Sequence, residues 1–133
     1  RMGLAPDHDA ARSLASIPKV AMVAAPAPAT TISGGRIAAA DMSILVRMIS
    51  MEQPHKAVPI TGAICLAVAC RIPGTVPNGL CTVISDGLVV SHPSGAILVD
   101  AEVADTDSGF EAVSGRVYRT ARKLFSGAVH YRP

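Results

Sequence analysis

Residues 61–72 read Thr-Gly-Ala-Ile-Cys-Leu-Ala-Val-Ala-Cys-Arg-Ile, and Pro73-Gly74 follows at once. This pattern predicts a helix that ends at about residue 72. The first nine or so positions offer no polar face, and a helix that is apolar all round has to be buried all round. In a chain of this size, such burial requires a sheet that wraps around the helix. Small residues such as Gly62 and Ala67 would let the strands approach closely.

The flanking segments supply candidate strands. Residues 19–24 are predicted to form a buried strand, which Pro26 and Pro28 close. Residues 42–51 would fit a helix by length, but the alternation of their side chains favours a strand. Further strands are predicted over Leu80–Ser85, Leu88–Ser91, Ala96–Val103, Val113–Tyr118 and Ala128–Tyr131. The expected fold class is α+β, a mostly antiparallel sheet around one buried central helix, with residues 1–133 in a single domain.

Local signals predict two short helices and two connections. Asp7 is the expected N-cap of a helix that runs to about Ala15. Residues 120–125 read as a short basic helix that ends at Ser126-Gly127. Asp86-Gly87 is a strong hairpin signal between two of the predicted strands, and residues 105–109 read as a polar loop.

Composition excludes several classes of protein. Half of the 133 residues are hydrophobic, 17% are charged and the net charge is +2, so the chain is too apolar to be intrinsically disordered. The charge is too small and the aromatic residues too few to indicate a nucleic-acid partner. The longest uncharged apolar run, residues 57–70, is shorter than the roughly 20 residues of a membrane span. No secretory signal opens the chain, so a cytoplasmic location is expected.

Three cysteines are present, an odd number, and none forms a Cys-x-x-Cys pair: Cys65, Cys70 and Cys81. Free thiols in a reducing compartment are the favoured interpretation. A disulfide or a metal site stays open as the alternative.

The approach to the central helix is the first candidate site. Free N–H groups at a helix start, together with the positive end of the helix dipole, favour an anion. Ile60, Thr61 and Gly62 would supply these groups, and His55 and Lys56 add positive charge nearby. In the alternative reading, Thr61 merely caps the helix and His55-Lys56 lies in a solvated loop.

A second candidate site is His92-Pro93-Ser94-Gly95, between two predicted strands. Tight turns of this kind can aim successive N–H groups at an anion. An ordinary hairpin turn is the alternative. Arg119, Arg122 and Lys123 lie at helical spacing and read as a solvated face.

Four stretches together resemble the PrpF family. They are Ile49–Thr75, which contains His-Lys-Ala-Val-Pro-Ile-Thr-Gly, then His92–Gly95, Val117–Leu124 with Gly127 after it, and Ile17–Ala21. They are similar to the landmarks of the C-terminal half of that family, in the same order. The first residue is Arg1, so the chain is expected to begin within a longer protein.

The resemblance implies a diaminopimelate epimerase-like fold and an isomerase. Members of the family include 2-methylaconitate cis-trans isomerase and 4-oxalomesaconate tautomerase. The implied reaction moves a proton and a double bond in a di- or tricarboxylate, with no metal or organic cofactor. The implied substrate-binding residues are His55, Lys56, Ile60, Thr61, Gly62, His92, Ser94 and Gly95.

The same resemblance implies that this chain is only the substrate-binding half. The family's N-terminal domain supplies a catalytic lysine and a cysteine-bearing loop, so no catalytic residue is assigned here. The epimerase relatives carry a cysteine just before Thr-Gly, where this chain has sequence around Pro59. The strand over Ala128–Tyr131 is expected to pair with that other domain, and exposed strand edges predict a homo-oligomer. A non-catalytic truncated homologue, acting as an assembly or small-acid-binding module, is the alternative.

Overall fold

The computed structural model describes residues 3–14, 18–83, 87–128 and 130–132. It contains helices α1 (His8–Arg12), α2 (Ile60–Arg71) and α3 (Val76–Leu80) and a 3₁₀ turn, η1 (Ala39–Asp41). The strands of the described residues are β1 (Val20–Ala24), β2 (Ala29–Thr30), β3 (Arg36–Ile37), β4 (Ile44–Ser50), β5 (Gln53–Pro54), β6 (Leu88–His92), β7 (Gly95–Thr106) and β8 (Gly109–Val117). None of the described helices is long and apolar enough to cross a membrane.

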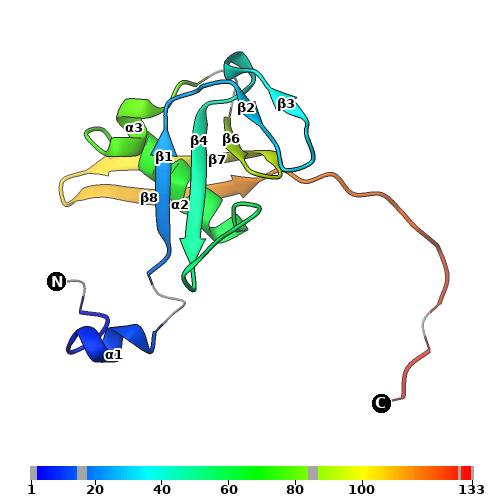
Figure 1. Cartoon of the computed structure of the whole chain (residues 1–133), viewed down its shortest axis with the longest axis horizontal. Helices are drawn as coiled ribbons and strands as arrows, with labels where there is room; N and C mark the ends of the chain where they lie inside the picture. Colours follow the sequence, from blue (N-terminus) through cyan, green and yellow to red (C-terminus); the bar gives the residue numbers. More distant parts are fainter. Residues whose placement is uncertain (1–2, 15–17, 84–86, 129, 133) are drawn as a thin grey trace.

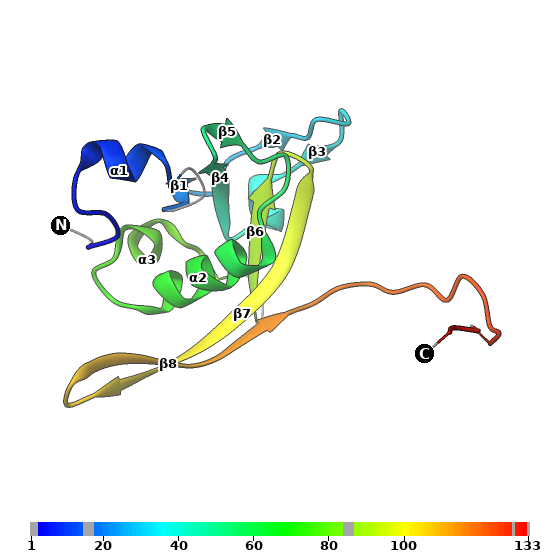
Figure 2. The same cartoon turned by 90° about the horizontal axis from the view of Figure 1, so that it is seen from below.

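One curved sheet forms the body of the protein. Its strand order is β1-β4-β6-β7-β8, with β5 paired to the end of β4. Neighbouring strands are antiparallel except β4 and β6, which pair in parallel with Ile44 opposite Val90. Figures 1 and 2 show α2 lying across the sheet, with the long β7–β8 hairpin passing along it. The predicted α+β arrangement is therefore confirmed.

Helix α2 is buried on the side that faces the sheet. Ala63, Leu66, Ala67 and Cys70 pack into a core that the inner faces of β4, β6 and β7 complete. The helix is not covered all round, because Ile60 is 52% exposed and Thr61 and Cys65 are also exposed. The sheet of the described residues stays open between its edge strands β1 and β8, and this opening leaves one stripe of α2 in contact with solvent.

Two glycines set the distance between α2 and the sheet. A Cβ atom on Gly62 would lie 2.7 Å from the Cε of Met48 on β4. A Cβ atom on Gly115 of β8 would lie 2.6 Å from the Cγ2 of Ile64. The small residues of the helix were expected to allow close approach, and Gly62 does so. On β8, however, it is the strand that supplies the glycine.

Several predicted elements are confirmed with shifted ends. Asp7 caps α1 by accepting a hydrogen bond from the N–H of Ala10 at 2.8 Å, and the helix ends at Arg12. The predicted strands over 19–24 and 42–51 are β1 and β4. The burial predicted for the first of them is wrong, because β1 is the exposed edge strand of the sheet. The polar loop over 105–109 is instead a tight turn, closed by the Thr106 hydroxyl donating to the Gly109 carbonyl at 2.6 Å.

The strand predicted over Leu80–Ser85 is wrong where the structure describes it. Residues 76–80 form α3, and residues 81–83 belong to no strand. Thr75 starts the helix, because its hydroxyl accepts a hydrogen bond from the N–H of Asn78 at 3.2 Å. Pro77 suits the first helical turn. The rest of the predicted strand and Asp86 of the predicted hairpin turn lie outside the described residues.

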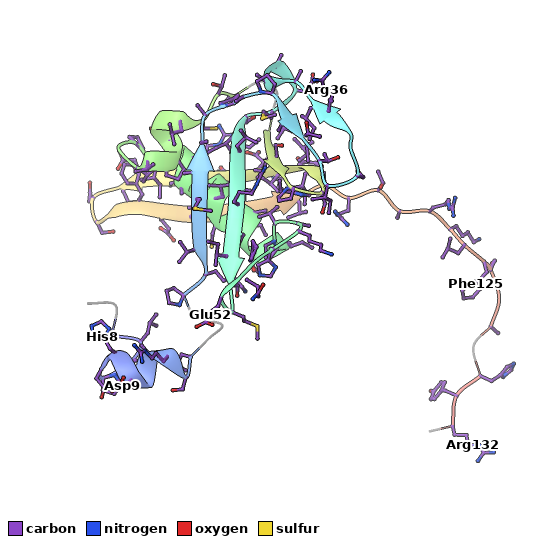
Figure 3. All side chains as sticks on the ribbon, in the orientation of Figure 1. His8, Asp9, Arg36, Glu52, Phe125 and Arg132 are labelled. Atoms are coloured by element: carbon purple, nitrogen blue, oxygen red, sulfur yellow. The ribbon has the colours of Figure 1, made fainter. Side chains whose placement is uncertain are left out.

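The chain after β8 forms no helix or strand in its described residues. The helix predicted over Thr120–Phe125 is wrong, because so short a helix needs an apolar face packed against the protein, whereas Leu124 and Phe125 are 77% and 75% exposed. Figure 3 shows Phe125 and Arg132 on a segment that runs away from the sheet. Residues 128, 130 and 131 form no strand in this chain, and their pairing with another domain stays a prediction.

Ion pairs join the C-terminal end of α2 to β7 and β8. Arg71 donates to a carboxylate oxygen of Asp100 at 2.7 Å, and Arg116 lies 3.7 Å from the other oxygen. Burial alone would raise the pKa of Asp100. The hydrogen bonds from Arg71 and the Ala101 N–H, with the nearby positive charges, outweigh it and lower the pKa below its ordinary value of 3.8.

Replacing Asp100 with asparagine is expected to lower the free energy of unfolding at pH 7 by about 1–2 kcal/mol, as for a partly screened hydrogen bond between charged groups. Because the folded pKa lies below the unfolded one, this contribution is present above about pH 4 and is lost as the pH falls through the folded value. Urea unfolding at pH 7 and pH 2.5 checks this. Asp105→Asn, on the same strand with no ion pair to a described residue, is the control. Equal losses at both pH values would contradict the assignment.

Candidate functional site

A cavity of about 580 Å³ opens at the N-terminal end of α2. It lies where the α2 start, the β6–β7 turn and the residues after β8 meet. Two histidines and one arginine are the ionisable groups of its wall. The lining residues are His55, Ala57, Val58, Pro59, Ile60, His92, Ser94, Ala96, Ile97 and Arg119.

The start of α2 has no side-chain cap. Pro59 occupies the N-cap position and offers no polar side chain, and the first hydrogen bond of the helix runs from the Ala63 N–H to the Pro59 carbonyl at 2.8 Å. The N–H groups of Ile60, Thr61 and Gly62 therefore have no acceptor within the helix. These donors and the positive end of the dipole favour an anionic group at this end of α2.

The β6–β7 turn fixes the ring of His92. The Ser94 N–H donates to Nδ1 of His92 at 3.2 Å, and the Ser94 hydroxyl donates to the Lys56 carbonyl at 2.7 Å. With Nδ1 acting as an acceptor, the proton of the neutral ring sits on Nε2. Ser94 thus ties the loop before α2 to the turn. Direct contact between Ser94 and an anion stays a prediction, and it would require these two bonds to break.

His92 is held in its neutral form. Burial lowers its pKa below the ordinary value of 6.5, and the positive charges of Arg47 and Arg119 lower it further. At pH 7 the ring therefore offers a neutral Nε2–H donor. An incoming carboxylate would offset the two positive charges and raise the pKa of His92.

The structure brings together only part of the predicted site. The predicted residues that line the cavity are His55, Ile60, His92 and Ser94. Lys56 is exposed beside them, and Gly95 starts β7 opposite His92 with a φ of +144° that favours glycine.

Thr61 and Gly62 face a different space. They line a second, mostly apolar hollow of about 550 Å³ on another side of the α2 start, together with Lys19, Cys65 and Val76. Gly62 was expected to offer its N–H group to an anion and to let the strands approach the helix. Its position against Met48 shows that it lets the helix reach the sheet.

Arg119 is the residue that sequence reasoning missed. The basic spacing around it was read as a solvated helix face, but no helix forms there and Arg119 lines the cavity. A signal was present in the strand before it. Val117 pairs with the buried Val99, and residues two positions apart share a face of a strand. Extending that alternation past the end of β8 would have placed Arg119 on the cavity side.

No metal centre is visible in the part of the chain that the structure describes. Its His, Cys, Asp and Glu side chains form no group of three that could hold an ion. The three cysteines are free thiols, as the sequence favoured.

Comparisons with known proteins agree with the fold and the motifs. The sequence model of the family described as PrpF protein matches residues 1–132. The chain is 35% identical to a 2-methyl-aconitate isomerase of Shewanella oneidensis over 97% of this chain and 33% of that protein. It is 33% identical to a (4E)-oxalomesaconate Delta-isomerase of Novosphingobium over 86% of this chain and 29% of that protein.

A solved structure gives the same result for the architecture. The crystal structure of a methylitaconate-delta-isomerase superposes with a TM-score of 0.73 at 28% identity and covers 88% of this chain and 32% of that one. The diaminopimelate epimerase-like fold is thereby confirmed. The chain spans about a third of the length of the curated relatives it matches. With its family match over nearly every residue and its sheet wrapped on α2, the chain belongs to the PrpF family.

Proposed function

We propose that this chain is the substrate-binding half of an isomerase that moves a proton and a double bond in an aconitate-like di- or tricarboxylate. The cavity at the start of α2 is the observation that carries this proposal. It joins Ile60, whose N–H has no acceptor within α2, to Arg119 and to the Nε2–H donor of His92. The named relatives, which act on methyl-aconitate, oxalomesaconate and 3-methylitaconate, support the class of substrate.

The chemistry of such a shift explains why donors are needed. When a proton leaves the carbon next to the double bond, negative charge spreads onto a carboxylate. Donors that are already aimed at those oxygens lower the barrier without reorganising during the reaction. The N–H groups of α2 and the guanidinium of Arg119 take this role in the proposal.

His92 acts as a donor rather than a base in this arrangement. Its Nε2 carries the proton and its Nδ1 accepts from the Ser94 N–H, so neither nitrogen can take up a proton while this bond holds. We place the proton-transfer base outside this chain, in the part of the relatives that it does not span. The chain then contributes binding and charge stabilisation.

Titration with trans-aconitate tests the binding half of the proposal. Amide NMR shifts are expected at Ile60 and at His55 and His92 on the same cavity wall. Arg119→Gln should weaken binding about tenfold or more, as for the loss of one hydrogen bond to a charged group. Arg122→Gln removes the same charge from an exposed position off the cavity wall and should bind like the wild type. Equal weakening by the two variants would mean that only the overall positive charge of the chain matters for binding. The absence of shifts at Ile60, His55 and His92 would contradict the site.

A further inference from the structure

Two cysteines meet where α2 and α3 pack together. Cys70 is the penultimate residue of α2 and is 6% exposed, and Cys81 directly follows α3 and is partly exposed. The two thiols lie close enough to perturb each other's pKa. This contact lies within the hydrophobic core cluster, against which Cys81 packs.

The backbone around both cysteines is anchored. Asn78 of α3 donates its side-chain amide to the Cys70 carbonyl at 2.8 Å. The Cys81 N–H donates to the Pro77 carbonyl at 2.9 Å. The Asn78 bond holds α3 at the end of α2, and the Pro77 bond fixes the backbone of Cys81 at the end of α3.

We propose that Cys70 and Cys81 form a reversible disulfide that locks α3 onto α2. The oxidant is a small disulfide of the glutathione class. The Cys81 thiolate attacks one sulfur of that disulfide, forms a mixed disulfide and releases one small thiol. The Cys70 thiolate then attacks the Cys81 sulfur, forms the protein disulfide and releases the second small thiol. Two protein thiols are oxidised, one small disulfide is reduced, and the two protons end on the released thiols.

The surroundings decide the order and the rate. Cys81 is the more exposed of the two and meets the oxidant first. Burial and the neighbouring Cys81 together raise the pKa of Cys70 to about 12, although the positive charge of Arg71 lowers it somewhat. Burial also raises the pKa of Cys81. Because thiolates are the attacking species, oxidation should be slow at pH 7 and faster at pH 9.

The disulfide would act on the second hollow. Val76 and Pro77 of α3 form part of its wall, opposite Cys65 and Ala69 of α2. Locking α3 fixes this wall and leaves the cavity at the start of α2 untouched. Cys65 is exposed and outside the pair, so Cys65→Ser gives a background in which only the proposed pair can react.

The test treats the Cys65→Ser chain with oxidised glutathione at pH 9, quenches with acid and analyses tryptic peptides by mass spectrometry. Cleavage after Lys56, Arg71 and Arg116 separates the two cysteines onto peptides 57–71 and 72–116. The expected product is these peptides joined, with two hydrogens lost and no glutathione attached. The melting temperature should rise by about 5–10 °C and return on reduction.

Three outcomes would overturn the proposal. They are stable glutathione adducts at Cys81, two free thiols after oxidation, or a joined product that forms only in urea. Cys65→Ser/Cys81→Ser is the matched control. It should give no joined peptides and no oxidant-dependent change in melting temperature, and such a change in this control would also count against the proposal.

Discussion

Gly115→Val is expected to lower the free energy of unfolding by about 2–3 kcal/mol, within the range for overpacked cores. A Cβ at this position would lie 2.6 Å from the Cγ2 of Ile64, and valine adds two more methyl groups. Ile64 cannot turn away easily, because a β-branched side chain in a helix has one strongly preferred rotamer. β8 is pinned to β7 by the pairing of Gly115 with Ala101. Urea unfolding followed by circular dichroism measures the loss.

The same substitution at Gly79 is the matched control. A Cβ at Gly79 meets nothing within 4 Å, and valine is a better helix former than glycine, so stability should hold or rise. Ile64→Ala should also make Gly115→Ala less destabilising than it is in the wild-type background, as expected for residues in contact. An unchanged unfolding midpoint for Gly115→Val would mean that α2 does not pack on β8 as described.

The isolated chain should bind trans-aconitate and fail to exchange its allylic protons. Exchange should fail because, in the proposal, the proton-transfer base lies outside this chain. Losing one partner in acid–base catalysis typically costs about 10²–10⁴-fold in rate. Open solvent at the cavity also weakens the remaining dipoles. In D₂O, the proton NMR signal of the trans-aconitate methylene group should persist with the isolated chain. With a full-length family member under the same conditions, exchange for deuterium should remove this signal.

The control for this prediction is a full-length family member that carries the residues of this cavity. Exchange there and none in the isolated chain supports the substrate-binding half. Binding without exchange in both would favour the non-catalytic small-acid-binding module. Rapid exchange by the isolated chain would contradict the proposal, and His55→Gln and Lys56→Gln would then be made first, because these residues lie on and beside the cavity wall.

The centre of the fold could be predicted because its signals are strong. The first nine or so positions of residues 61–72 offer no polar face, and Pro-Gly follows the segment. The alternation in 44–50 indicates a strand with one buried face. The same reasoning failed over 80–83 and 120–125, where patterns depend on what packs against them. A threonine cap and a proline start α3. The helical spacing in residues 120–125 does not show whether another part of the protein packs against them.

The candidate site could be predicted only in part, for a similar reason. An uncapped helix start before Thr61-Gly62 is readable in the sequence, and so is a tight turn at 92–95. The close approach of α2 to β4 decides that Gly62 lies against Met48. The path of the chain after β8 decides that Arg119 lines the same cavity as His92. Both are distances across the fold, and no local pattern encodes them.

The parallel pairing of β4 with β6 has a consequence during protein synthesis. About forty residues separate the end of β4 from the start of β6, and ribosomes add about 5–20 residues per second. The inner face of β4, with Ile44 and Val46, therefore waits about 2–8 s for its neighbour at such rates. α2 begins only ten residues after β4 ends, so it can cover that face first. Substitutions that weaken α2 should thus raise aggregation on the ribosome even where the finished fold tolerates them.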